Sequence, residues 1–411
     1  MKCRFCGNPL THEFVDLGLS PPSNSYLTAE QLNGPEAKYP LKAFVCDRCF
    51  LVQIDEYKRA ADIFDGDYAY FSSYSKTWLD HAAAYVDMAS TRFGLTPDSR
   101  VIEIASNDGY LLQYFKQKNI PVLGIEPTVG TARVARDKGI ETLTKFFGSE
   151  FAQGLADRGI QGDLVLGNNV LAHVPDINDF VEGLKIVLKV DGVITMEFPH
   201  LLQLVENNQF DTIYHEHFSY LSLGTTRQIF AAHGLTVFDV DEIPTHGGSL
   251  RIYARHSENA GEVSSNVERV LANERQHGMT RVDYYLGFQE KAERARKDLI
   301  AFLDEAERSG KSVAACGAAA KGNTLLNYCG VTSGQISFVV DASPHKQGLF
   351  MPGSRIPIVD ESRLRLEKPD YVLVLPWNIK NEITEQLQYI REWGGQFVTA
   401  IPELRIFSYT K

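Results

Sequence analysis

The stretch SRVIEIASNDGYLLQYFKQKN, from Ser99 to Asn119, joins an apolar run to an amphipathic run through a small polar turn. The apolar run predicts a buried strand, and the run after the turn predicts a helix. The alternation continues, with strand-like runs VLGIEP, GDLVLGNN and GVITMEFP and helix-like runs TARVARDKG and INDFVEGLKIVLK. Repeated strand–helix units indicate an α/β fold with a doubly wound parallel sheet, which binds its ligand at the carboxyl ends of the strands.

The turn from Glu103 to Gly109 indicates what this sheet binds. It lacks the G-x-G-x-x-G fingerprint that cradles a dinucleotide pyrophosphate. Its one glycine and its small polar residues suit a ligand without phosphates. Glu126 ends the second strand, where a carboxylate can accept hydrogen bonds from both hydroxyls of a ribose.

An acid-rich first turn followed by a strand-ending acid resembles the class I S-adenosylmethionine-dependent methyltransferases. The resemblance implies that Asn107 and Asp108 lie near the cationic methionine end of the cofactor, and that Phe146 and Phe147 of KFFG wall its adenine. Many of these enzymes carry glycine where this chain has Ala105, and alanine suits a tight turn if its φ stays negative. Another doubly wound fold with an ordinary turn is the alternative.

The C-terminal third repeats the alternation after a helical connector over residues 259–309. Strands are predicted in SVAACGAAAKGN, ISFVVDASPHKQG, YVLVLPWN and QFVTAIP, and a helix in NEITEQLQYIREWG. The turn CGAAAKGN places backbone N–H groups and Lys321 at a helix N-terminus, which favours an anion such as phosphate. Lys346 and Arg355 in the next loop add positive charge. A close-packed turn with solvated lysines is the alternative.

Four of the six cysteines form two C-x-x-C pairs, Cys3 with Cys6 and Cys46 with Cys49. Two such pairs supply four thiolates to one tetrahedral zinc ion, which leaves no open position for catalysis. The sequence therefore predicts structural zinc in a small module with a thin core. Redox pairs or unligated thiols are the alternative.

Composition limits the partners of this 411-residue chain. Its formal net charge of −11 provides no basic field for nucleic acid. No apolar run approaches the roughly 20 residues that span a bilayer, and the N-terminus lacks the pattern of a signal peptide. We therefore expect a cytoplasmic protein with neither a nucleic-acid nor a membrane partner.

The segment TIYHEHFSYL, Thr212 to Leu221, concentrates titratable groups among apolar ones. On an extended chain His215 and His217 share one face. HEH lacks the H-E-x-x-H spacing of helical zinc sites, and no third ligand is near, so a metal here is disfavoured.

A second polar stretch is PTHGGSLRIY, which contains His246, Gly247, Gly248 and Arg251. The glycines allow a ligand to approach the backbone closely, and the arginine is suited to a phosphate. A tight turn before a strand is the alternative.

Motifs in a specific order extend this reading over essentially the whole chain. They are CRFC…CDRC with LGLSPPSNSYL between, YAYFSSYS, VIEIASNDGYLL, GIEPT, NNVLAHVPD, YHEHFSYLS, HGGSLRIY, GAAAKGNTLLN, DASPHKQG and PWN. Together they resemble the sugar C-methyltransferases of nucleotide-linked deoxysugars, notably the C-3′-methyltransferases of the tetronitrose and kijanose pathways.

This resemblance implies a zinc-binding domain over residues 1–66, a methyltransferase domain over 67–258, and a helical connector with a Rossmann-like domain over 259–411. It implies S-adenosylmethionine as cofactor and a thymidine or guanosine diphosphate 4-keto-6-deoxy sugar as substrate, held in the cleft between domains. We expect a monomer or a weak homo-oligomer.

The resemblance also implies roles for individual residues. We choose His217 as the base, because a neutral imidazole suits proton abstraction near neutral pH, and Glu216 as its orienting or substrate-binding neighbour. The further catalytic candidates are Tyr214, Tyr70 and His173. The cofactor candidates are Glu103, Ser106, Asn107, Asp108, Gly109, Glu126, Pro127, Phe147, Asn168 and Asn169. The substrate candidates are His246, Gly247, Gly248, Arg251, Lys321, Lys346 and Arg355.

Three other functions compete with this reading. A nicotinamide-dependent sugar-nucleotide oxidoreductase or epimerase is disfavoured by the missing pyrophosphate fingerprint. A non-catalytic zinc-stapled module would keep the fold without the reaction. An O-methyltransferase would use the same fold on another acceptor atom.

Overall fold

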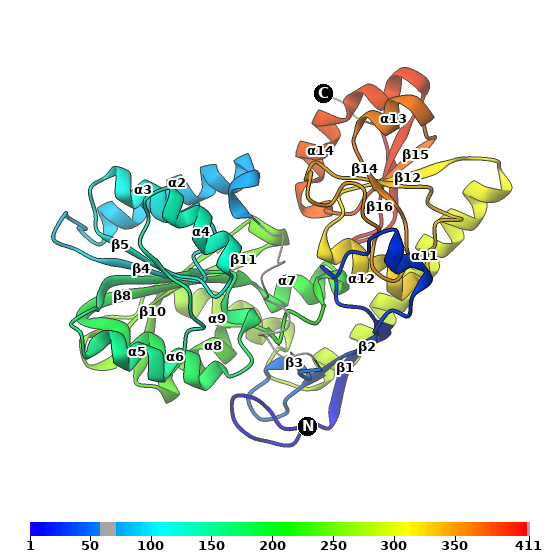
Figure 1. Cartoon of the computed structure of the whole chain (residues 1–411). Coiled ribbons are helices and arrows are strands. Elements are labelled where there is room, and N and C mark those ends of the chain that lie inside the picture. Colours follow the sequence, from blue (N-terminus) through cyan, green and yellow to red (C-terminus); the bar gives the residue numbers. More distant parts are fainter. Residues whose placement is uncertain (58–70, 409–411) are drawn as a thin grey trace. The chain divides into compact units, whose positions relative to one another are not determined.

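The computed structural model describes residues 1–57 and 71–408, and the chain divides into two compact units (Figure 1). The first unit comprises Met1–Leu10, Cys46–Leu201 and Glu216–Arg281, and the second comprises Thr11–Val45, Leu202–His215 and Val282–Lys411. The segment expected to form the zinc-binding domain therefore contributes to both units. The division into three domains stays a prediction.

A seven-stranded sheet forms the centre of the first unit. Its strands are β4 (Val101–Ile104), β5 (Val122–Ile125), β6 (Thr142–Leu143), β7 (Gly162–Asn168), β8 (Leu188–Pro199), β10 (Leu235–Ile243) and β11 (Ser249–His256). They pair in the order β10-β11-β8-β7-β4-β5-β6. The doubly wound α/β fold predicted from Ser99 onward is confirmed.

One strand departs from the predicted all-parallel sheet. β11 runs antiparallel to both neighbours, with Ser249 opposite Pro199 of β8 and Ile243 of β10. The connection over residues 244–248 is too short for the crossover that parallel neighbours require. This hairpin consequently places the HGG turn beside the carboxyl end of β8.

Helices cover both faces of this sheet. They are α2 (Lys76–Arg92), α3 (Leu112–Gln117), α4 (Val129–Asp137), α5 (Ser149–Ala156), α6 (Ile177–Val187), α8 (Leu223–Ala232) and α9 (Ser265–His277). Figure 1 shows α2, α3 and α4 on one face and α5, α6 and α8 on the other. Under the first group, Tyr85 and Phe115 are fully buried and meet edge to face, with ring centroids 6.5 Å apart.

The second unit contains the predicted C-terminal α/β sheet. Its strands are β12 (Val313–Cys316), β13 (Val339–Val340), β14 (Ile358–Val359), β15 (Tyr371–Val374), β16 (Gln396–Thr399) and β17 (Arg405–Phe407). They pair in the order β14-β13-β12-β15-β16-β17, and only β17 runs antiparallel to its neighbour. The sheet is therefore Rossmann-like, as expected.

The remaining helices are α7 (Leu201–Glu206), α10 (Asp283–Leu286), α11 (Phe288–Arg308), α12 (Ala320–Cys329), α13 (Ser362–Glu367) and α14 (Lys380–Gln386). The single helix predicted over NEITEQLQYIREWG is wrong. α14 ends at Gln386, and a 3₁₀ helix follows over Gln388–Trp393. Tightened turns are common at helix ends, and Gly394 closes this one with a φ of 82°.

Short antiparallel pairs complete the fold. β1 (His12–Ser20) pairs with β2 (Tyr39–Val45) in the second unit, and β3 (Val52–Ile54) pairs with β9 (Ser219–Tyr220) in the first. The long loop expected between the cysteine pairs thus contains a hairpin. Among the residues that the structure describes, no helix is both long enough and apolar enough to cross a membrane.

Candidate functional site

The turn after β4 adopts a backbone that few residue types tolerate. Ala105, Asn107 and Gly109 have φ angles of 57°, 50° and 75°, in the left-handed region. A Cβ atom on Gly109 would lie 2.4 Å from Cδ1 of Ile140 and 3.3 Å from Cβ of Ala135, so a side chain there would need its neighbours to shift. The condition under which alanine suits this turn, a negative φ, is not met at Ala105. Its conformation costs about 1–2 kcal/mol, and such strain concentrates at ligand sites.

Glu126, at the end of β5, fastens this turn. Its carboxylate accepts hydrogen bonds from the backbone N–H groups of Asn107 and Thr128, each at 2.9 Å. Burial raises the pKa of Glu126, and these two donors oppose the rise. The carboxylate is therefore held at the strand end where the ribose contact is expected.

Glu103 lies in β4, two residues before Ala105 of this turn. It is 1% exposed, and neither carboxylate oxygen has a hydrogen-bond partner within residues 1–57 and 71–408. Burial raises the pKa of Glu103 well above its usual value, and the carboxylates of Asp108 and Glu126 raise it further. Buried polar atoms are rarely left unpaired. The carboxylates of Glu103, Asp108 and Glu126 therefore fit a cationic ligand, such as the ammonium and sulfonium groups of S-adenosylmethionine.

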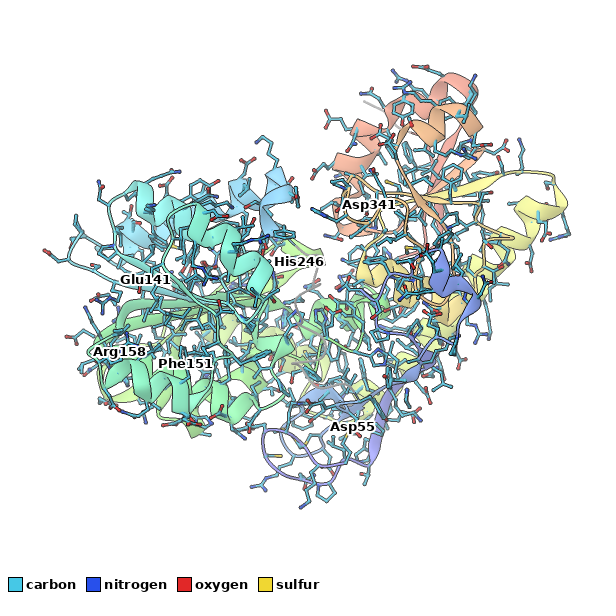
Figure 2. The ribbon with its side chains drawn as sticks, viewed as in Figure 1. Asp55, Glu141, Phe151, Arg158, His246 and Asp341 are labelled. Carbon is cyan, nitrogen blue, oxygen red and sulfur yellow. The ribbon has the colours of Figure 1, made fainter. Side chains whose placement is uncertain are left out.

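Binding of S-adenosylhomocysteine should release protons from Glu103, because the ligand ammonium favours the charged carboxylate and lowers its pKa. Glu103→Gln should abolish this release and weaken binding by roughly 10- to 100-fold, the value of a hydrogen bond to a charged group. Calorimetry in two buffers of different ionisation enthalpy measures both effects. The exposed Glu141, labelled in Figure 2, gives the matched control Glu141→Gln. Equal proton release by wild type and Glu103→Gln would remove Glu103 from the cofactor site.

The other cofactor candidates lie at or near the carboxyl ends of the strands. Ser106 Oγ and Asn168 Nδ2 are buried and have no hydrogen-bond partner in the described part of the chain. Pro127 is half-buried directly after Glu126. Phe147 packs edge to face on Phe180 of α6, with centroids 5.4 Å apart.

His246 joins the cofactor candidates to the substrate candidates. Its Nε2 lies 3.0 Å from Nδ2 of Asn169, and its ring meets the Trp78 ring edge to face at 5.3 Å. Its φ is 53°, and Gly247 and Gly248 follow at 88° and 113° (His246 is labelled in Figure 2). The HGG turn thus has three consecutive residues with positive φ, and His246 contacts Asn169, directly after β7, and Trp78 of α2.

Arg251 does not stand ready for a phosphate as the sequence predicted. It is 6% exposed, and its Nη2 donates to Oε2 of Glu197 at 2.9 Å. His81 Nε2 lies 3.0 Å from both oxygens of Glu197, and Arg251 also covers the Tyr85 ring at 4.7 Å. Burial of Glu197 opposes its charge, but His81 and Arg251 together keep its pKa below the usual value. The arginine is committed to an internal ion pair.

Two of the catalytic candidates meet in the first unit. The His173 and His217 rings lie 4.6 Å apart, nearly perpendicular at 78°. His173 ends the 3₁₀ helix Leu171–His173 after β7, and Glu216, 3% exposed, precedes His217. Burial lowers the pKa of His173 to about 4, opposed by a hydrogen bond with the Glu216 backbone. His173 is therefore neutral at neutral pH beside the expected base.

Acid should destabilise the protein through His173. Its folded pKa of about 4 lies below the unfolded value near 6.5, so the unfolded chain alone gains this proton as the pH falls. This stability is fully present above about pH 6.5 and is lost toward pH 4. Between pH 7 and pH 5 the loss is about 2 kcal/mol. Urea denaturation at both pH values should show a smaller loss in His173→Asn, and an equal loss would contradict the assignment.

The structure gives His215 the role that the sequence leaves open. It lies in the second unit, 3% exposed, and its Nε2 donates to the Pro40 carbonyl at 3.2 Å. Its ring meets Tyr39 edge to face at 6.0 Å, and burial lowers its pKa. Thr324 Oγ1 donates to the Ile213 carbonyl at 2.9 Å. His215 is thus an anchor for its segment.

The last two catalytic candidates are Tyr214 and Tyr70. The chain passes from the second unit to the first between His215 and Glu216, so Tyr214 and His217 belong to different units. Tyr214 is half-buried. Tyr70 lies outside the described residues, and its role stays a prediction.

Lys321 of α12 has several partners within the second unit. Its Nζ donates to Oδ1 of Asn378 at 2.7 Å and lies 4.7 Å from the centre of the Trp377 ring. Trp377 Nε1 donates to Oδ2 of Asp211 at 2.8 Å. Burial raises the pKa of Asp211 to about 6, while Lys321 and Trp377 oppose the rise. Lys321 therefore faces a carboxylate as well as the helix N-terminus.

The other two basic candidates differ in whether they contact the turn that contains Lys321. Lys346 Nζ donates to the carbonyl of Ala318, in the turn after β12, at 2.8 Å. Arg355 donates instead to the Leu32 carbonyl at 2.8 Å. Lys346 is therefore adjacent to the predicted anion site, whereas Arg355 contacts a different loop.

The four N-terminal cysteines converge in the first unit. All their sulfur atoms lie within 4.8 Å of one another, with Cys3 and Cys49 at 3.5 Å and Cys6 and Cys46 at 3.6 Å. A tetrahedron with Zn–S bonds of about 2.3 Å places its sulfurs about 3.8 Å apart. Gln53 Nε2 lies 3.3 Å from the Cys3 sulfur. The arrangement fits structural zinc, as predicted.

Four residues with contacts at the site are not among those that the sequence predicts: Trp78, His81, Thr128 and Glu197. Glu197 had a signal, because it stands near the carboxyl end of a predicted strand in the same way as Glu103 and Glu126. Trp78 and His81 had only a three-residue spacing on a helix, which is equally typical of packing.

Comparison with known proteins covers the whole chain. A zinc binding domain model matches residues 3–64, a methyltransferase domain model matches 78–240, and a C-methyltransferase C-terminal domain model matches 244–402. The C-methyltransferase NovU of Streptomyces niveus is 37% identical over 99% of this chain and 97% of its own. A ubiquinone biosynthesis O-methyltransferase of Chelativorans sp. (strain BNC1) is 28% identical over 27% of this chain and 47% of its own.

Proposed function

The chain belongs to the C-methyltransferase family, and from this premise we propose that it methylates carbon 3′ of a nucleotide-linked 4-keto-6-deoxy sugar. The observation that carries the proposal is the contact between His173 and His217, in the same unit as the turn that fits S-adenosylmethionine. Removal of a proton next to a ketone requires a base and a donor to the enolate oxygen, and this pair supplies the base, His217.

The ketone determines the chemistry. A C–H bond beside a carbonyl is acidic because its electron pair delocalises onto the carbonyl oxygen as an enolate. S-adenosylmethionine supplies an electrophilic methyl group. When bound, this cofactor would give its methyl group to the enolate carbon and would leave as S-adenosylhomocysteine, with the C3′ proton on the base.

The chain's own residues divide this work. His217 takes the C3′ proton, and Glu216 orients it or contacts the sugar. His173 stays neutral because burial lowers its pKa to about 4, and its hydrogen bond with the Glu216 backbone helps to hold the segment that carries His217. Glu103 and Glu126 hold the methyl donor at the ends of β4 and β5.

Product analysis tests the proposal. The chain is incubated with S-adenosylmethionine and 4-keto-6-deoxy sugars of thymidine or guanosine diphosphate. We expect a mass gain of one methylene and an NMR signal for a methyl group on a quaternary ring carbon. A methoxy signal would indicate O-methylation instead. Tight NADH binding without binding of S-adenosylhomocysteine in calorimetry would favour an oxidoreductase.

A further inference from the structure

Arg4 lies inside the first cysteine pair and reaches away from it. Its Nη1 donates to the Pro175 carbonyl, and its Nη2 donates to the Ile54 carbonyl at 2.7 Å. Its guanidinium also covers the Phe218 ring, 5.3 Å from the centroid. One side chain therefore connects three segments of the first unit.

Two of these contacts adjoin the catalytic histidines. Pro175 stands two residues after His173, and Phe218 directly follows His217. The Phe218 carbonyl in turn accepts a hydrogen bond from the Ile54 N–H at 3.2 Å. Arg4 consequently contacts the chain two residues after His173 and one residue after His217.

The zinc site fixes the other end of Arg4. The Arg4 N–H donates to Oε1 of Gln53 at 2.9 Å, and Nε2 of Gln53 lies 3.3 Å from the sulfur of Cys3. Asn178 of α6 adds a second link, because its Nδ2 donates to the Phe5 carbonyl at 2.9 Å. The cysteine pair is thereby joined to the segment that carries His173.

We propose that Arg4 is a positioning residue, which transmits the rigidity of the zinc site to the His173–His217 pair. The inference rests on the proposed function for its effect on catalysis, but not for its effect on the histidines. A planar guanidinium donates to two carbonyls in fixed directions, which an ammonium or thioether cannot reproduce. A displacement of about 1 Å at a reacting group costs about 10²-fold in rate.

The test compares Arg4→Met and Arg4→Lys with the control Arg136→Met. Arg136, on α4, also donates to a backbone carbonyl, that of Thr142 at 2.9 Å, which is not in a segment next to either histidine in the sequence. For Arg4→Met we expect an unchanged zinc content, an affinity for S-adenosylhomocysteine within about twofold of wild type, and kcat lowered by roughly 10- to 100-fold. Arg4→Lys should recover only part of kcat.

Histidine ¹⁵N NMR makes the outcome independent of turnover. Signals of His173 and His217, assigned by single replacement, should move in Arg4→Met and stay unchanged in Arg136→Met. Unmoved histidine signals in Arg4→Met would overturn the inference, whether or not the enzyme acts on any sugar. Moved signals in a protein that methylates none of the sugars would instead leave Arg4 as a positioning residue and contradict the proposed function.

Discussion

Replacing His217 with asparagine should lower turnover by roughly 10²- to 10⁴-fold, the usual contribution of a positioned general base. Asparagine keeps a polar side chain but does not accept a proton near neutral pH. The affinity for S-adenosylhomocysteine, measured by calorimetry, should stay within about twofold of wild type, because the cofactor candidates lie at the ends of β4, β5 and β7.

The matched control is His277→Asn at the exposed end of α9, which should leave turnover unchanged. A wild-type rate in His217→Asn would exclude His217 as the base. A fall in cofactor affinity equal to the fall in turnover would place it in the cofactor site instead.

Loss of one zinc ligand should have the largest effect on stability. Structural zinc contributes roughly 10 kcal/mol or more in small zinc-binding peptides, comparable with the whole stability of a typical domain. Cys46→Ser should therefore lower the zinc content well below one ion per chain and lower Tm strongly. Metal analysis and thermal denaturation measure the two effects.

Cys329→Ser is the control, because Cys329 is a buried cysteine outside the metal cluster, on α12. Its substitution should leave the zinc content unchanged and lower Tm only slightly, through a small loss of packing. Full zinc content and a wild-type Tm in Cys46→Ser would contradict a closed four-cysteine shell.

The sequence alone predicts the α/β class, the cysteine cluster and the position of the methyl-donor turn. Each depends on local signals: strand–helix alternation after Ser99, two C-x-x-C pairs, and the carboxylates Glu103 and Glu126 at strand ends. The family match confirms the resemblance to C-methyltransferases. These features are readable because backbone periodicity and ligand spacing act over a few residues.

The parts that the sequence could not supply depend on long-range contacts. Arg251 looked suited to a phosphate, but it pairs with Glu197, which is far away in the chain. The role of His215 follows from its hydrogen bond to the Pro40 carbonyl, which is 175 residues away in the sequence. Ala105 has a positive φ in the turn whose Asn107 N–H donates to Glu126, and alanine rarely adopts this conformation.

Proton exchange at the sugar shows whether His217 removes the C3′ proton. A 4-keto-6-deoxy nucleotide sugar is incubated with the chain and S-adenosylhomocysteine in deuterium oxide, so that methyl transfer cannot occur. We expect NMR to show deuterium at C3′ with the wild type and almost none with His217→Asn. The wild type could instead transfer the methyl group to oxygen under turnover conditions and exchange no proton at C3′ in this assay. That result would contradict proton removal by His217 and methylation at C3′.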